Sequence, residues 1–310
     1  MNDLPFIAAD RLWSLLPMRD AIDVLEAAFA ATDIGAPTRS HVAVPAGDLL
    51  VMPAHGPQGV GVKLVTVTPD NPSRGLPLIH GLYALFAADT MAPTALIDGA
   101  ALTGLRTAAV SGLATRHLAR DDATRLVVFG AGAQARTHVA AMRAVRPIDH
   151  VSIVSRTMEA AEVLVEELRA QGIDARAGTP AAVGRAHVVC TCTTSASPVV
   201  DGALLADGVH INAVGAYRPT IRELDTRTLV RGRGRIVVEQ RDAALDEAGD
   251  LVLAMREGAL SRDDIAADLA EVVAGAPVRG SGDDITVFKS VGLAMEDLAV
   301  AAAAVARLDR

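Results

Sequence analysis

Cysteine is almost absent from this chain of 310 residues, which contains only Cys190 and Cys192. The two lie two positions apart in an apolar segment, where side chains share one face of a strand but are poorly placed to form a disulfide. We therefore predict two reduced thiols, as is usual in the cytoplasm. The first residues show neither the basic nor the apolar region of a secretory signal, so we predict a cytoplasmic protein.

The marks of several other protein classes are also missing. No run of about 18 apolar residues occurs, so no membrane-spanning helix is expected. The formal net charge is −8 and no basic block offsets it, which argues against a nucleic-acid partner. The motifs G-x-S-x-G and H-E-x-x-H are absent, and the eight histidines lack the spacing of metal ligands, so we expect no catalytic metal. We therefore predict that the partner of this protein is a small molecule.

Apolar residues are plentiful, at 51% of the chain, and their pattern changes along it. From residue 125 onward, short apolar segments alternate with helical patterns, which is typical of a parallel sheet covered on both faces. We predict a doubly wound α/β domain of the Rossmann type. Its strands are expected at residues 125–129, 150–155, 187–193, 210–215 and 235–239.

The first 110 residues follow another pattern, with extended segments punctuated by proline and glycine and few helical stretches. Such a run favours a mixed or antiparallel sheet in a separate α+β domain. Residues 287–308 are predicted to form an alanine-rich helix after the Rossmann sheet is finished, and to return to the first domain. We therefore predict a discontinuous first domain, residues 1–113 plus 291–310, and a Rossmann domain at residues 114–290.

The segment VVFGAGAQA, residues 127–135, has the form of a dinucleotide-binding turn. Gly130 would allow the tight turn, Gly132 would let the backbone approach a pyrophosphate, and Ala135 would let the helix pack closely on the strand. The helix N-terminus would offer free N–H groups and a partial positive charge to phosphate oxygens. A plain backbone turn is the alternative, but the strand before it and the helix after it favour a cofactor.

The end of the second predicted strand bears on which cofactor binds. An NAD site usually has an acid there, whereas this chain has Ser155, Arg156 and Thr157, with no acid before Glu159. A guanidinium and two hydroxyls suit the 2′-phosphate of NADP(H), which we favour over NAD(H). Alternatively, Arg156 begins a surface helix that Ser155 or Thr157 caps.

Three cations of the first domain are candidates for binding a substrate. Lys63 lies inside an apolar strand, where it either faces water at a sheet edge or has a function, because lysine is rarely buried without a partner. Arg106 lies in a helix of small apolar residues and would suit a carboxylate through two parallel hydrogen bonds. Arg39 precedes a strand and could reach the same cleft, although ordinary surface is its alternative. With no matching acids nearby, the three predict a small anionic substrate.

The segments GLRTAAVSGLATRHLA, VVFGAGAQARTH, SRT, INAVGAYRPTIRELD and ITVFKSVGLAMEDLAVA occur in this order. Together they resemble the ornithine cyclodeaminase and mu-crystallin family, from about Leu49 to the end and more loosely from Arg39. The resemblance implies an N-terminal domain that binds substrate and forms a homodimer, a nucleotide domain after it, and a final helix that returns to the first domain.

The resemblance also implies roles for individual residues. Lys63 and Arg106 would be catalytic, and together with Arg39, Met52 and Tyr217 they would bind the substrate and its α-carboxylate. A longer set would bind the cofactor at its pyrophosphate, at its 2′-phosphate, along the adenosine or nicotinamide path, or over the nicotinamide itself. This set is Arg106, Thr107, Gly130, Ala131, Gly132, Ala133, Gln134, Ser155, Arg156, Thr157, Cys192, Thr193, Thr194, Val214, Phe288, Lys289 and Ser290.

One position departs from the family members that convert ornithine to proline. These carry an aspartate in the loop after N-A-V-G, where this chain has Tyr217, and a phenol with a pKa of about 10 is a poor base at neutral pH. The R-P-x-x-R-E-L-D after this loop resembles the mu-crystallin branch instead, whose members reduce cyclic ketimines with NADPH. The NADP(H) features at Arg156 agree, because cyclodeaminases use a bound NAD.

We therefore predict an NADPH-dependent oxidoreductase that reduces a cyclic ketimine, Δ1-pyrroline-2-carboxylate or Δ1-piperideine-2-carboxylate, to proline or pipecolate. One alternative is an NAD(P)-dependent amino-acid dehydrogenase of the alanine or arginine type, which runs the same hydride chemistry in reverse. The others are an ornithine cyclodeaminase and a non-catalytic NADPH-dependent binding protein. The presence of Arg39, Lys63 and Arg106 favours turnover over binding alone.

Overall fold

The computed structural model describes residues 4–308, which fall into two units. Unit 1 takes the described residues of Met1–Arg106 and Leu293–Arg310, and unit 2 is Thr107–Gly292. The chain passes from unit 1 to unit 2 within helix α3, Gly99–Leu118, and returns after Gly292. Unit 1 therefore consists of segments from both parts of the chain.

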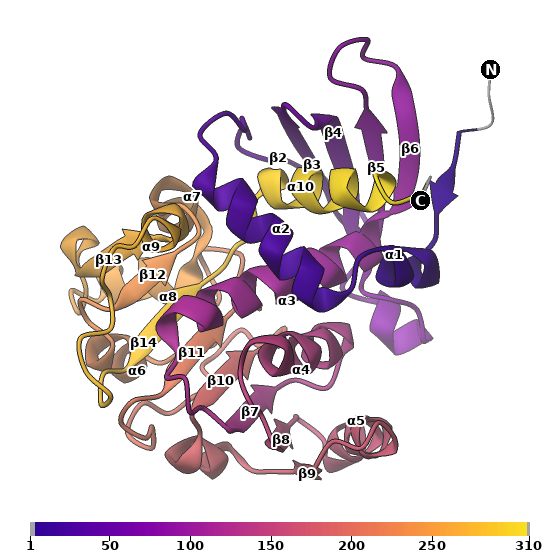
Figure 1. Cartoon of the computed structure of the whole chain (residues 1–310). Coiled ribbons are helices and arrows are strands. Elements are labelled where there is room, and N and C mark those ends of the chain that lie inside the picture. Colours follow the sequence, from indigo (N-terminus) through magenta and orange to yellow (C-terminus); the bar gives the residue numbers. More distant parts are fainter. Residues whose placement is uncertain (1–3, 309–310) are drawn as a thin grey trace. The chain divides into compact units, whose positions relative to one another are not determined.

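Unit 1 contains one six-stranded mixed sheet (Figure 1). Its strand order is β1-β6-β5-β4-β3-β2, with β1 parallel to β6 and the other neighbours antiparallel. Residues of β4 alternate between buried and more exposed, so one face of the sheet is packed and the other is open. The strands are β1 Phe6–Ile7, β2 Ser40–Val44, β3 Gly47–Gly56, β4 Gly59–Val67, β5 Ile79–Phe86 and β6 Pro93–Asp98.

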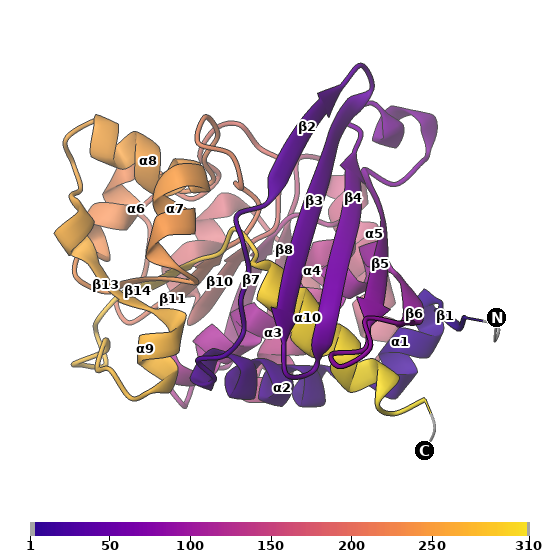
Figure 2. The ribbon, with the colours of Figure 1, turned by 90° about the horizontal axis from the view of Figure 1, so that it is seen from above.

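The packed face of this sheet is covered by α10, Ala294–Val305, which crosses β3, β4 and β5 (Figure 2). Helix α10 also packs against α2, Met18–Ala30, which follows the short helix α1, Ala9–Leu15. Beyond the end of α10, Arg307 donates to the Asp20 carboxylate over 2.7 Å and so attaches the helix to α2. The last helix of the chain is thus an integral part of unit 1.

Unit 2 contains an eight-stranded sheet in the order β13-β12-β14-β11-β10-β7-β8-β9, and every neighbouring pair is parallel. Consecutive residues such as Leu126, Val127 and Val128 are all buried, so both faces of the sheet are covered. The strand order changes direction between β7 and β10, as in a doubly wound fold. The strands are β7 Arg125–Phe129, β8 His150–Val154, β9 Ala175–Ala177, β10 Val188–Thr191, β11 His210–Ala213, β12 Ile236–Val238, β13 Ile265–Asp268 and β14 Thr286–Lys289.

The helices of unit 2 connect successive strands and pack on the sheet (Figure 1). The predicted fold class, a Rossmann-type parallel sheet with an additional α+β domain, is confirmed. The helices are α4 Ala133–Val145, α5 Met158–Ala170, α6 Thr226–Arg231, α7 Arg241–Glu247, α8 Gly249–Arg256 and α9 Leu269–Val273, with 3-10 turns at Asn71–Arg74 in unit 1 and at Pro180–Arg185 and Arg262–Asp264 in unit 2.

The prediction of a helix throughout residues 287–308 is wrong at its beginning. Thr286–Lys289 form β14, a central strand of the unit 2 sheet between β11 and β12, and the helix starts only at Ala294. Four buried residues pair with two neighbours here, and this tertiary pairing outweighs the helical preference of the alanine-rich segment after it. The strand β13 was also not predicted.

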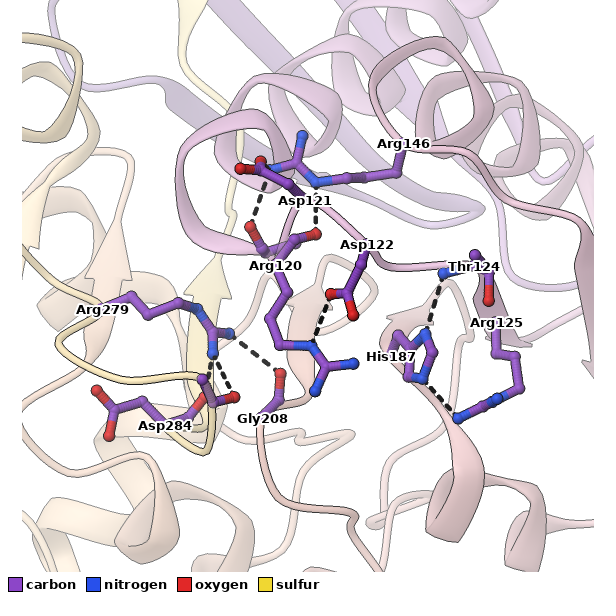
Figure 3. Close-up of polar contacts among 12 residues, drawn as sticks. Arg120, Asp121, Asp122, Thr124, Arg125, Arg146, His187, Gly208, Arg279 and Asp284 are labelled. Atoms are coloured by element: carbon purple, nitrogen blue, oxygen red, sulfur yellow. Dashed lines mark hydrogen bonds and ion pairs between the residues drawn. The ribbon is translucent and has the colours of Figure 1, made fainter.

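Two arginines stabilise the C-terminal end of α3 (Figure 3). The last carbonyl groups of a helix have no partner within it and need donors from elsewhere. Arg146 donates to the carbonyls of Ala119 and Arg120, both over 2.8 Å, and Arg279 donates to Leu118 over 2.7 Å. This end of α3 is therefore tied to α4 and to the segment that precedes β14. Among the described residues, no helix has the length and apolar character needed to cross a membrane.

Candidate functional site

The glycine turn of unit 2 has the backbone shape that the sequence predicts. Gly130 follows β7 with a φ of +111°, and a Cβ atom there would lie 2.5 Å from the carbonyl oxygen of Cys192, so only glycine fits. Gly132 is the residue before the first turn of α4, and a Cβ atom at that position would meet no atom within 4 Å. The backbone N–H groups at the start of α4 are therefore open to an approaching group.

Gln134 and Ala135 complete the first turn of α4. Ala135 is fully buried, which allows the helix to pack closely on the sheet. The buried Oε1 atom of Gln134 has no hydrogen-bond partner among the described residues. An open helix N-terminus beside an unpartnered amide oxygen fits the diphosphate and ribose of a dinucleotide, so Gly130, Ala131, Gly132, Ala133 and Gln134 are the residues that would hold it.

The segment after β8 contains Ser155, Arg156 and Thr157, and no carboxylate ends this strand. Arg156 is exposed, and Thr157 is the N-cap of α5, with its hydroxyl accepting a hydrogen bond from the backbone N–H of Ala160 over 3.4 Å. The alternative prediction that Thr157 caps a helix is therefore confirmed. This cap leaves the Arg156 guanidinium and the Ser155 hydroxyl at the same strand end.

A buried carboxylate, Glu223, joins the loops after β10 and β11. It accepts hydrogen bonds from the hydroxyl of Thr191 over 2.7 Å, from the backbone and hydroxyl of Thr193 over 2.7 and 2.6 Å, and from the N–H of Gly215 over 2.7 Å. Burial raises the pKa of Glu223, and the positive charge of Lys289 opposes this shift. Glu223 was not predicted from the sequence. It fixes the carboxyl edge of the sheet, where Cys192, Thr193, Thr194 and Val214 also lie.

The Phe288, Lys289 and Ser290 stretch lies deep in unit 2. Phe288 and Lys289 are fully buried in β14, and the Lys289 ammonium is 3.1 Å from the Asp250 carboxylate. Ser290, at the end of the strand, donates to Glu239 over 2.6 Å. The assignment of these three residues to the cofactor stays a prediction.

In unit 1, Lys63 lies on the packed face of the sheet beneath α10. It is 1% exposed, and its Nζ atom is 2.8 Å from Oδ1 of Asp297 in the first turn of α10. The alternative of an edge-strand lysine that points to water is therefore wrong. Met52 and Tyr83 are its direct neighbours on β3 and β5, and both are buried.

Arg106 reaches the same place from α3. Its Nη1 atom is 2.9 Å from Oε2 of Glu296, and its Nε atom is 3.3 Å from Oδ1 of Asp297. The expectation of cations without matching acids is wrong, because two consecutive acids of α10 meet Lys63 and Arg106. These acids lie about 190 residues or more along the chain from their partners, so only the return of α10 to unit 1 brings them together.

The charges around Lys63 set its proton affinity. Burial and the positive charge of Arg106 lower the pKa of Lys63 to about 8, the charge and hydrogen bond of Asp297 oppose this, and Arg39 lowers the pKa further. Burial and the charge of Asp297 raise the pKa of Tyr83 well above its usual value, so the phenol stays neutral. Burial, Arg106 and Arg39 thus favour the neutral lysine, and Asp297 favours the protonated one.

The structure thus gathers Arg39, Met52, Lys63 and Arg106 in unit 1. Tyr217 lies in the loop after β11 of unit 2, half-buried, with the Arg218 guanidinium 5.4 Å from its ring centre. The remaining predicted cofactor residues are distributed along the carboxyl edge of the unit 2 sheet and the strand β14. Thr107, the residue after Arg106, is buried in α3.

Comparison with known proteins extends this description. The family model of the ornithine cyclodeaminase/mu-crystallin family matches residues 6–308. A Delta(1)-pyrroline-2-carboxylate reductase of Bacillus cereus is 41% identical over 263 residues, which cover 81% of this chain and 79% of that protein.

Two solved structures share the fold of the whole chain. The Delta(1)-pyrroline-2-carboxylate reductase of Thermococcus litoralis, in complex with NADH and L-proline, has a TM-score of 0.93 and 34% identity, and covers 98% of this chain and 97% of that one. An archaeal alanine dehydrogenase dimer with bound NAD has a TM-score of 0.92 and 33% identity, with 98% and 95% covered.

Proposed function

Because the chain belongs to the ornithine cyclodeaminase/mu-crystallin family, we propose that it is an oxidoreductase that reduces a cyclic ketimine with a nicotinamide cofactor. The substrate is Δ1-pyrroline-2-carboxylate or its six-membered homologue Δ1-piperideine-2-carboxylate, and the product is proline or pipecolate. The observation that carries the proposal is the buried pair of Lys63 and Arg106, because it combines a carboxylate-binding guanidinium with a lysine whose pKa is about 8.

In this reaction Arg106 and Arg39 bind the substrate carboxylate. A guanidinium offers parallel N–H donors that match the two oxygens of a carboxylate. Glu296 and Asp297 orient the guanidinium of Arg106, so the substrate carboxylate meets a donor in a fixed position. This fixes the ring with its C=N bond in one orientation, which lowers the barrier by positioning.

Lys63 supplies the proton. Its ammonium donates to the imine nitrogen, which makes the neighbouring carbon more electrophilic, and Lys63 regains a proton before the next turnover. When bound, the nicotinamide supplies the hydride that this carbon receives. One hydride on carbon and one proton on nitrogen convert the ketimine into the cyclic amino acid.

We also propose NADP(H) as the preferred cofactor, with NAD(H) as the alternative. The proposal rests on the exposed Arg156 at the end of β8, next to Ser155, in a position without a carboxylate. The solved relatives contain NADH or NAD, so they support a nicotinamide cofactor of either kind.

The proposed assembly is a homodimer through the open face of the unit 1 sheet. Val51, Leu64 and Leu82 lie directly opposite one another on β3, β4 and β5, and Leu64 and Leu82 are 40% and 36% exposed. An antiparallel sheet with an apolar outer face favours a covering partner. The dimeric alanine dehydrogenase supports a second copy of the same chain as that partner.

The second candidate function is an amino-acid dehydrogenase, which the similarity to alanine dehydrogenase favours. Its chemistry is the same hydride transfer in reverse, with water attacking the imine. A cyclodeaminase is less well supported, because Tyr217 stands where the reaction needs an aspartate.

The deciding experiment follows the absorbance of NADPH and NADH separately, with each cyclic ketimine and then with pyruvate plus ammonia. Parallel reactions contain ornithine and NAD and are assayed for proline. We expect rapid loss of NADPH with a cyclic ketimine and slower loss of NADH. Oxidation of NADPH or NADH only with a 2-oxo acid plus amine would identify an amino-acid dehydrogenase. Formation of proline from ornithine, without reduction of any ketimine, would identify a cyclodeaminase. Cofactor binding without any turnover would establish a binding protein.

A further inference from the structure

The two acids at the start of α10 are the least expected part of the unit 1 cluster, since neither is a residue that the substrate chemistry requires. We propose that Asp297 is a positioning residue for Lys63, which holds its ammonium at one place and keeps the proton on it. The inference rests on the proposed function, in which Lys63 donates a proton, and it adds a residue to that site.

The contact itself is short and sealed from solvent. The Nζ atom of Lys63 and Oδ1 of Asp297 are 2.8 Å apart, and the two side chains are 1% and 0% exposed. Lysine has four rotatable side-chain bonds, so a buried ammonium adopts one position only when a charged or polar partner holds it. Asp297 is the carboxylate that meets it, and the first turn of α10 favours a negative charge there.

The surrounding charges make this partner necessary. Arg106 on α3 and Arg39 before β2 both repel the ammonium of Lys63, and both favour its neutral form. Tyr83 on β5 stays neutral and therefore contributes no charge. Of the groups that set the pKa of Lys63, Asp297 alone favours the protonated lysine.

Glu296 has a different partner and therefore leaves this role to its neighbour. Its Oε2 atom is 2.9 Å from Nη1 of Arg106, so it orients the guanidinium that binds the carboxylate. Oδ1 of Asp297 also lies 3.3 Å from Nε of Arg106, but Arg106 keeps its shorter contact with Glu296 when Asp297 is replaced, whereas Lys63 loses its carboxylate partner. The Oδ2 atom of Asp297 has no hydrogen-bond partner among the described residues, which leaves Oδ1 as the atom that meets Lys63.

The composition of the chain allows a direct test, because it contains only two lysines, Lys63 and Lys289. Protein labelled with 13C at the lysine ε-carbon gives two signals, and their pH titration reads the pKa of Lys63 without any substrate or cofactor. Lys289→Arg assigns the signals. In Asp297→Asn we expect the pH midpoint of the Lys63 titration, the Lys63 midpoint, to fall by about one unit or more. The attraction by the Asp297 carboxylate is then lost, while the repulsion by Arg106 and Arg39 stays.

The kinetic test separates charge from position. In Asp297→Asn the alkaline limb of the pH profile of kcat/KM moves to lower pH together with the Lys63 midpoint. In Asp297→Glu the charge stays, so the midpoint lies near that of the natural chain, but the longer arm displaces the ammonium and kcat falls about tenfold. A merely structural role would instead give a loss of activity that is equal at all pH values.

The matched control is Asp20→Asn, which removes a partly exposed ion pair with Arg307 just beyond the same helix. It should leave the Lys63 midpoint and the pH profile unchanged. An unchanged midpoint in folded Asp297→Asn would overturn the inference. If that variant does not fold, an unchanged kcat in Asp297→Glu would overturn it instead. A natural chain that reduces no ketimine would refute the proposed function, while the titration would still decide the role of Asp297.

Discussion

Lys63 combines burial with a pKa of about 8, which is the combination that a proton donor needs near neutral pH. Its charge depends on one carboxylate and two guanidinium groups rather than on water. The strand β4 fixes its backbone, and α10 supplies its partner. The lowered pKa of this side chain is therefore a property of the folded unit 1 and not of the local sequence.

The first prediction concerns Lys63. Lys63→Ala removes the proton donor, so we expect kcat/KM for the cyclic ketimine to fall about 100-fold while the Kd for the cofactor stays the same. In the natural chain the rate should fall as the pH rises through about 8, because the donor must be protonated. Stopped-flow and steady-state kinetics from about pH 6 to about pH 10 measure both. Full activity in the Lys63→Ala variant would remove Lys63 from the mechanism.

The second prediction concerns two buried histidines of unit 2. Burial lowers the pKa of His138 to about 4 and that of His210 to about 3, so both are neutral in the folded chain. The unfolded chain binds their protons below about pH 6.5, so stability falls as the pH falls from there toward 4. For His138 this amounts to about 3 kcal/mol. Calorimetry of His138→Gln should show a Tm that depends less on pH, and parallel curves would contradict this.

At the scale of helices and strands, the amino-acid pattern predicts the longer strands of unit 2 better than its short ones. The strand predicted at residues 125–129 matches β7, and that at 150–155 extends one residue beyond β8. The prediction merged β14 with the helix after it, because a periodic pattern over only four residues is too short to be told apart from its neighbours.

The candidate site was also predicted only in part from the sequence. Lys63, Arg106 and the glycine turn can be identified by residue type and motif, because a buried cation and a strand–turn–helix are unusual in themselves. Asp297 and Glu223 cannot, because an acid in the first turn of a helix or in a loop is ordinary in sequence. Their importance comes from tertiary contacts with residues about 30 or 234 positions away.

The third prediction tests the end of α3. Arg279 donates to the carbonyls of Leu118 and Asp284, both over 2.7 Å, so Arg279→Ala removes the donor of Asp284 and leaves Leu118 with only the Thr286 hydroxyl over 3.2 Å. We expect a loss of about 2–3 kcal/mol in the free energy of unfolding, measured by urea denaturation. Arg136→Ala, which breaks an exposed ion pair with Glu167, is the control and should cost less than about 1 kcal/mol. Equal losses would mean that the capping contacts of Arg279 contribute no more than an exposed ion pair.

At the scale of the whole molecule, the residues proposed for substrate and for cofactor fall in separate units. Unit 1 contains Lys63 and Arg106, the cations proposed to act on the substrate, together with their partners on α10. Unit 2 contains the glycine turn and the carboxyl edge of the parallel sheet. Truncation before α10 would therefore remove the partners of Lys63 and Arg106 although both cations would remain.

The fourth prediction tests the proposed homodimer. Leu64→Glu places a charge in the middle of the open apolar face of the unit 1 sheet, where it would be buried in a dimer. We expect the mass measured by light scattering to fall from that of a dimer to that of one chain. Val163→Glu, at an exposed position of α5 in unit 2, is the control and should stay dimeric. A natural chain that is already monomeric would refute the proposed assembly.

Because the chain has only two lysines and both are buried, cleavage after lysine measures local unfolding of the chain. A protease that cleaves only after lysine has two bonds to attack, after Lys63 in β4 and after Lys289 in β14, and these side chains are 1% and 0% exposed. Each bond is cut only when its strand leaves the sheet, because proteolysis of a buried site follows the population of the opened form. One strand belongs to unit 1 and the other to unit 2, so the order in which the fragments appear tells which unit opens first.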